Sequence, residues 1–228
     1  MVCKINSISP LILRPRKPSC IRNQQEPISI SAPAKTQLPK TSRVDFKTLG
    51  SCKLGISRYP DFEYNAEGGA GTGTVIRIKD GDDLNSNEIS VCFDLECLYI
   101  PPLTSETTRF LGLPMPPFLK IDIVPQLFQG SINKESGKVD LEFMAEFVFS
   151  AGSIYRAPPL MVKTVLTSEE SNGKVRSGRG ERLDEEGRCR LVGVATVDPI
   201  DDFFMNSFLG LPTECLAILN AILSFSPS

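Results

Sequence analysis

The sequence predicts a mainly β protein, either a single antiparallel β-barrel or a two-sheet sandwich. Two features predict it. Apolar and polar residues alternate along several segments, and turn-forming residues separate these segments at short intervals. Separately, no apolar run is long enough to cross a membrane as a helix. We expect about eight strands, with short helices and a C-terminal amphipathic helix.

Residues 139–149 give the clearest strand. Every second position is apolar, and the residues between them are Asp140, Glu142, Met144, Glu146 and Val148. This alternation is typical of a strand with one buried and one largely exposed face. The inward positions are Val139, Leu141, Phe143, Ala145, Phe147 and Phe149.

The other predicted strands are joined by short turns, among them Asn172-Gly173, whose residues both tolerate a positive φ. Short turns between successive strands favour an antiparallel meander, but the pattern does not choose between a barrel and a sandwich. These strands span residues 73–78, 88–100, 118–124, 127–131, 160–167, 175–183 and 189–197.

Three helices are expected. The first spans 105–111 and ends at Gly112, and the second begins at Asp198-Pro199 and ends at Gly210. The five residues Phe-Leu-Gly-Leu-Pro occur at both of these ends, at 110–114 and 208–212. A last helix would place Cys215, Leu216, Leu219, Ile222 and Leu223 on one face.

The charge distribution divides the chain into a leader, residues 1–49, and a β-rich globular domain, residues 50–228. The first 47 residues hold nine Lys or Arg and two acids, a net charge of +7, and the remainder has a net charge of −9. A basic, Ser-containing segment with few acids is typical of an organelle transit peptide.

The leader favours a plastid over other destinations. The apolar stretch at residues 10–13 is too short for a secretory signal, and six prolines interrupt the amphipathic helix that mitochondrial import favours. A nucleic-acid-binding arm is the alternative, but no aromatic residue precedes Phe46. We therefore expect a chloroplast protein, in the stroma or peripheral on the stromal side of thylakoids.

The composition also limits the chemistry. The chain has no histidine, which excludes histidine general bases and His-ligated metals. Its seven cysteines form no Cys-x-x-Cys pair, and the glycine-rich residues 68–73 lead into a strand rather than a helix. The basic residues between 174 and 190 are interspersed with acids and lack aromatic neighbours. We predict no metal, no cofactor and no nucleic-acid partner.

Two groups of residues are candidate sites. A corner between strands could hold the polar head of a ligand whose apolar tail lies among inward phenylalanines; the residues are Tyr155, Arg156, Pro158, Pro159, Phe143, Phe147 and Phe149. The alternative is a packed corner with Arg156 at the surface. The stripe of the last helix could contact a partner protein through Leu216, Leu219, Ile222 and Leu223, or pack against the sheet.

These observations favour a non-enzymatic plastid protein that binds an apolar ligand, lipid or pigment-like, or assists a photosynthetic membrane complex. Two alternatives remain open: an enzyme acting on a hydrophobic small molecule without histidine chemistry, and a purely structural assembly factor. An empty apolar cavity of several hundred Å³ would favour ligand binding, whereas a core filled by the phenylalanines would not.

Overall fold

The computed structural model describes residues 42–60, 62–76 and 88–227. The predicted leader up to residue 41 and strand residues 77 and 78 lie outside the described residues. The elements are β1 (Ser42–Thr48), β2 (Cys52–Ile56), β3 (Phe62–Tyr64), β4 (Ala70–Ile76), β5 (Glu88–Phe93), β6 (Thr108–Phe110), β7 (Leu113–Pro114), β8 (Leu119–Asn133), β9 (Val139–Ala151), β10 (Tyr155–Arg156), β11 (Leu160–Thr167), β12 (Glu170–Asn172), β13 (Ser177–Arg179), β14 (Arg188–Val197), α1 (Phe203–Leu209) and β15 (Thr213–Pro227).

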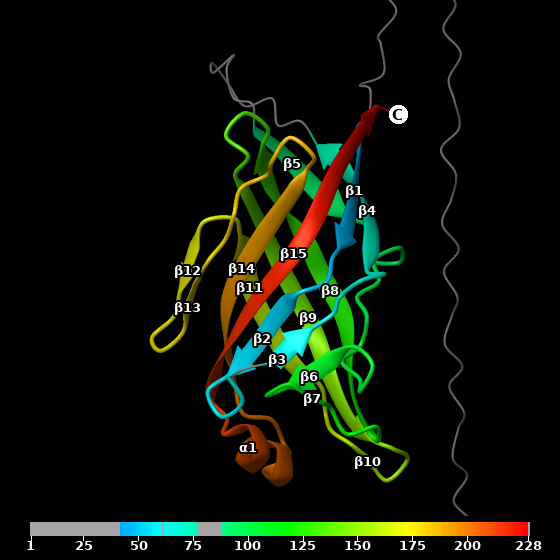
Figure 1. The fold of residues 1–228 in the computed structure, drawn as a ribbon, viewed down its shortest axis with the longest axis vertical. Coiled ribbons are helices and arrows are strands. Elements are labelled where there is room, and N and C mark those ends of the chain that lie inside the picture. The colour runs from blue at the N-terminus through cyan, green and yellow to red at the C-terminus, as the bar shows by residue number, and fades with distance from the viewer. Residues whose placement is uncertain (1–41, 61, 77–87, 228) are drawn as a thin grey trace, which may run out of the picture. The chain divides into compact units, whose positions relative to one another are not determined.

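In the described residues, eight antiparallel strands close into a ring, which confirms the mainly β class and selects the barrel (Figure 1). Their order is β1-β4-β5-β8-β9-β11-β14-β15, and β15 pairs back with β1 from Ser42↔Pro227 to Thr48↔Ala221. Because β1 begins at Ser42, the barrel starts ahead of the predicted boundary at residue 50.

The longest pairing, between β8 and β9, includes the strand that the sequence predicts most clearly. The two predicted strands 118–124 and 127–131 form one strand, β8, with a bulge between Pro125 and Leu127. By contrast, the predicted strand 88–100 ends at Phe93, where the chain turns.

A side sheet extends the barrel at one end. β1 and β2 both pair with β15, and they are separated at residues 49–51, where Ser51 has φ 57°. From β2 the sheet continues through β3 and β6 to β7. We call this end, which also carries α1 and β10, the helix end (Figure 1).

Of the three predicted helices, one forms, and it is shorter than expected. It begins after Asp202 rather than at Asp198, because the Asp202 side chain accepts a hydrogen bond from the Met205 amide, 2.8 Å away. It ends, as predicted, at Gly210, which has φ 70°.

The predicted helix at 105–111 is wrong. Thr108–Phe110 and Leu113–Pro114 form the hairpin β6–β7 instead. Leu111 and Gly112 form its turn, with φ 51° and 78°. The same five-residue sequence therefore makes a hairpin turn in one copy and a helix end in the other, because glycine with positive φ suits both.

The C-terminal amphipathic helix is also wrong, since residues 213–227 form β15. A continuous apolar run contains both helical and strand spacings, and periodicity alone does not separate them. Pairing with β14, from Arg188↔Ile222 to Val197↔Thr213, completes the barrel and outweighs local preference.

The predicted strand 175–183 is instead part of a small hairpin, β12–β13, on the outside of the barrel. A Cβ on Gly178 would approach Val192 and Leu216, at 2.6 and 3.1 Å, so the hairpin packs closely on β14 and β15. The Glu214 carboxylate accepts hydrogen bonds from the amides of residues 174, 175 and 176, at 2.6, 2.8 and 2.9 Å.

These three backbone donors hold the pKa of Glu214 below its usual range. The contribution of these hydrogen bonds to the stability of the folded protein is therefore fully present above the ordinary glutamate pKa of about 4.3. It is lost as the pH falls through the lower pKa that Glu214 has in the folded protein. We expect amide-exchange protection of residues 174–176 to fall in acid. In Glu214→Gln protection should be weaker and independent of pH; the same acid dependence in that variant would contradict this account.

Candidate functional site

An apolar cavity of about 550 Å³ lies at the helix end. Its walls come from the side sheet, from the ends of β8, β9, β11 and β14, and from α1. The lining includes Leu54, Phe62, Phe110, Leu113, Leu119, Ile121, Phe147, Phe149, Leu160, Val162, Val197, Met205, Phe208 and Leu211. This volume is within the range of about 300–1,000 Å³ that small-molecule sites occupy.

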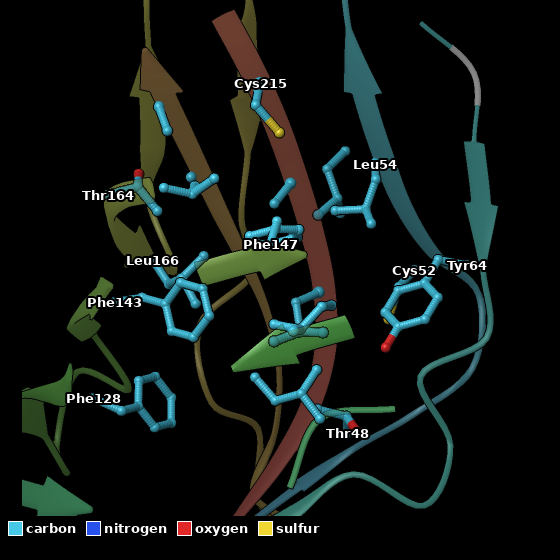
Figure 2. Close-up of a pocket in the computed structure, with 18 of the residues that line it drawn as sticks. Thr48, Cys52, Leu54, Tyr64, Phe128, Phe143, Phe147, Thr164, Leu166 and Cys215 are labelled. Carbon is cyan, nitrogen blue, oxygen red and sulfur yellow. The ribbon is translucent and has the colours of Figure 1, made fainter. Parts of the chain in front are cut away.

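A narrower inner cavity, about 70 Å³, continues toward the centre of the barrel. Figure 2 shows Cys215 toward one end of it and Phe128 toward the other. The inner cavity adjoins the outer one, because both are lined by Leu54, Phe147, Val162 and Cys215.

Aromatic packing closes the barrel beyond the inner cavity. Phe128 lies 5.0 Å from Phe46, 4.6 Å from Phe93 and 5.9 Å from Phe143 between ring centroids. All four rings are buried. The barrel is thus filled at the end where β15 finishes and hollow at the helix end.

Within the described part of the chain, no charged side chain lines either cavity. The polar groups of the inner cavity are already bonded to backbone: the Thr164 hydroxyl donates to the Val194 carbonyl at 2.9 Å, and Tyr64 and Thr48 donate to the carbonyls of Pro101 and Ala66. The inner cavity therefore offers no anchor for a charge.

The two thiols of the inner cavity are protonated at neutral pH. Burial raises the pKa of Cys215 to about 11 and also raises the pKa of Cys52. Because the thiolate is the nucleophile, neither cysteine is activated here.

Helix α1 closes part of the outer cavity with aromatic contacts. The Phe208 ring lies 5.2 Å from Tyr59 and 6.0 Å from Phe149, so it bridges the β2–β3 turn and β9. Met205, a residue of this helix, is fully buried.

The Tyr155 hydroxyl fixes α1 by donating to Asp202 Oδ2 at 2.7 Å. Burial and this bond raise the pKa of Tyr155 to about 12, and the bonds to Asp202 lower the pKa of that carboxyl, the one from the Met205 amide most. Tyr155 thus positions the helix.

The predicted ligand residues divide into three groups. Phe147 and Phe149 line the outer cavity, and Phe143 lies at the inner cavity, in contact with the aromatic packing. The corner residues Tyr155, Arg156, Pro158 and Pro159 line neither cavity, and Arg156 is exposed.

The predicted partner stripe is split by the strand geometry of β15. Leu219 lines the inner cavity and Leu223 is buried in the core, whereas Leu216 lies beneath the outer hairpin and Ile222 is half-buried. The four residues do not form one surface.

Several lining residues were missed from the sequence, chiefly those of β2, β3 and the β6–β7 hairpin. The repeated Phe-Leu-Gly-Leu-Pro was the available signal: Phe110, Leu113 and Pro114 of the first copy and Phe208, Leu209 and Leu211 of the second all line the outer cavity.

No protein-family model, curated protein sequence or solved structure matches this chain. The described residues contain no cluster of potential metal ligands. Among the described residues, no helix has the length and apolar character needed to cross a membrane.

Proposed function

We propose that the protein binds an uncharged apolar small molecule in the barrel, with no chemical step of its own. The observation that carries the proposal is the cavity of about 550 Å³ at the helix end, lined almost wholly by aliphatic and aromatic side chains. Burying the apolar surface of such a ligand supplies the free energy of binding.

The shape and polarity of the two cavities narrow the ligand class. A wide outer chamber and a narrow inner extension suit a molecule with a bulky part and a slender apolar end. A carboxylate or phosphate would have to give up its hydration without gaining a cation in return. A neutral lipid or pigment-like molecule fits these constraints. The proposed plastid location would contain such molecules.

The proposal can be tested by titrating the full chain with N-phenyl-1-naphthylamine, an uncharged fluorescent probe of apolar sites. Val162→Trp places an indole where the two cavities meet, and should weaken probe binding by about tenfold or more, or about 1.4 kcal/mol. The matched control is Met161→Trp, on the outward face of the same strand, where the side chain is 45% exposed.

Met161→Trp should bind the probe as the wild type does. Equal affinities of the wild type and both variants would place the probe elsewhere and contradict the proposal. Absence of saturable binding by the wild type would contradict it as well.

A further inference from the structure

The helix end carries a group of exposed apolar side chains around the outer cavity. Ile154 and Phe203 are 95% and 89% exposed, which is unusual for such residues. We call the group the apolar rim; its members are Leu111, Leu113, Phe118, Ile154, Phe203 and Phe204.

The apolar rim comes from separate parts of the chain that meet at the helix end (Figure 1). The Gly152 amide, in the turn that carries Ile154, donates to the Phe118 carbonyl at 2.8 Å. The Tyr155 and Phe204 ring centroids are 5.5 Å apart, which joins β10 to α1. Tyr59 lies 5.7 Å from Phe110 and 5.2 Å from Phe208, and so links the β6–β7 hairpin to the same helix.

The opposite end of the barrel differs. Its turns at residues 133–138 and 184–187 contain Asn, Lys, Glu, Ser, Asp and Gly and no large apolar side chain. Among the described residues, Ile76 at the end of β4 is also exposed at that opposite end, at 54%, but the larger group of exposed apolar side chains lies at the end that holds the cavity.

Charge at the helix end is nearly balanced. The described segments 57–60, 104–118, 152–159 and 198–212 contain three arginines and four acids: Arg58, Arg109, Arg156, Glu106, Asp198, Asp201 and Asp202. A surface that binds anionic lipid normally carries an excess of Lys and Arg. The near balance of charge therefore favours contact with a surface that has no net charge, through insertion of apolar side chains.

The apolar rim is continuous with the lining of the cavity. Leu113 lines the outer cavity and is also 71% exposed, and Phe204 stacks on Phe208, a lining residue, at 5.7 Å. An apolar ligand leaving the cavity into water would lose the favourable burial that holds it. A ligand that moves from the cavity into lipid would keep its apolar surface buried.

We propose that the apolar rim inserts into a lipid surface of no net charge, so that the outer cavity opens toward the lipid. The choice of lipid over a protein partner rests on the proposed apolar ligand, whose source and destination would be the lipid phase. The exposed side chains at the turn tips would enter the interfacial region, as aromatic and aliphatic side chains do in peripheral proteins.

The test is co-flotation of the full chain with phosphatidylcholine vesicles. The wild type should bind, and raising the NaCl concentration from about 0.01 to about 1 M should not release it, because screening weakens only electrostatic attraction. The double variant Ile154→Ser/Phe203→Ser should bind about 100-fold more weakly, roughly tenfold for each side chain. Val175→Ser is the control, since Val175 is 77% exposed but lies on the outer hairpin loop.

Several outcomes would overturn the proposal. They are no flotation of the wild type, binding that requires anionic lipid and is lost in salt, or equal weakening by Val175→Ser. Analytical ultracentrifugation tests the other occupant. If the wild type were a dimer and the double variant a monomer, the apolar rim would instead bind a second copy of the chain.

Probe titration separates this proposal from the proposed function. The double variant should bind N-phenyl-1-naphthylamine normally, which also shows that it is folded, and Val162→Trp should still float with vesicles. Loss of probe binding in the double variant would show damage to the cavity and would contradict a role confined to lipid contact. A wild type that floats but binds no probe would contradict the proposed function alone.

Discussion

Phe128→Ala should lower the free energy of unfolding by about 3–5 kcal/mol, the range for removing a buried aromatic side chain. Phe128 is 3% exposed and contacts the rings of Phe46, Phe93 and Phe143. Removing this ring leaves a void at the filled end of the barrel. The strands surround the void on all sides and cannot move inward to fill it. Urea unfolding followed by circular dichroism measures the change.

Phe118→Ala is the matched control, because Phe118 is 61% exposed and the same atoms are removed. It should change stability by less than about 0.5 kcal/mol. Phe128→Leu, which keeps most of the apolar volume, should cost about 1–1.5 kcal/mol and reports on the site if the alanine variant does not fold. Equal stabilities of Phe128→Ala and Phe118→Ala would contradict close aromatic packing around Phe128.

Gly130→Ala should cost about 3 kcal/mol, the upper part of the range for overpacking. A Cβ at this position would lie 2.0 Å from the Asp140 carbonyl oxygen and 2.8 Å from the Leu141 Cα. Both atoms belong to the backbone of β9, so no side-chain rotation relieves the contact and the two longest-paired strands must separate. The same urea experiment measures the effect.

Ser131→Ala is the control for Gly130→Ala. It lies next along β8 and already carries a Cβ, so its effect should stay within about 0.5 kcal/mol. A Gly130→Ala protein as stable as Ser131→Ala would contradict the close approach of β8 and β9 at Gly130.

Much of the fold was predictable because half-buried strands have a period of two. Residues 139–149 and 160–167 show that alternation, and both form strands close to the expected limits. Barrel closure was not predictable, because it depends on the pairing of β15 with β1, which are far apart in sequence. The final strand, β15, is not predictable for the same reason, because its conformation depends on pairing with neighbouring strands.

The site was predictable only in part. The inward phenylalanines of β9 were expected to meet an apolar ligand, and Phe147 and Phe149 do line the outer cavity. The remaining walls come from very short strands and from α1, whose positions depend on contacts such as that between Tyr155 and Asp202. The repeated five-residue sequence marks the two segments, but their meeting at one cavity depends on the tertiary fold.

The central claim is that the hollow half of the barrel holds an uncharged apolar molecule. The most direct measurement is mass spectrometry of organic extracts from the full chain, purified without denaturation from its native tissue, with tagged Val162→Trp and Met161→Trp expressed and purified in the same way. We expect one class of uncharged apolar molecule, at about one per protein, in the wild type and in Met161→Trp, and its loss from Val162→Trp. Extracts free of such molecules, or equal amounts from all three proteins, would contradict the claim.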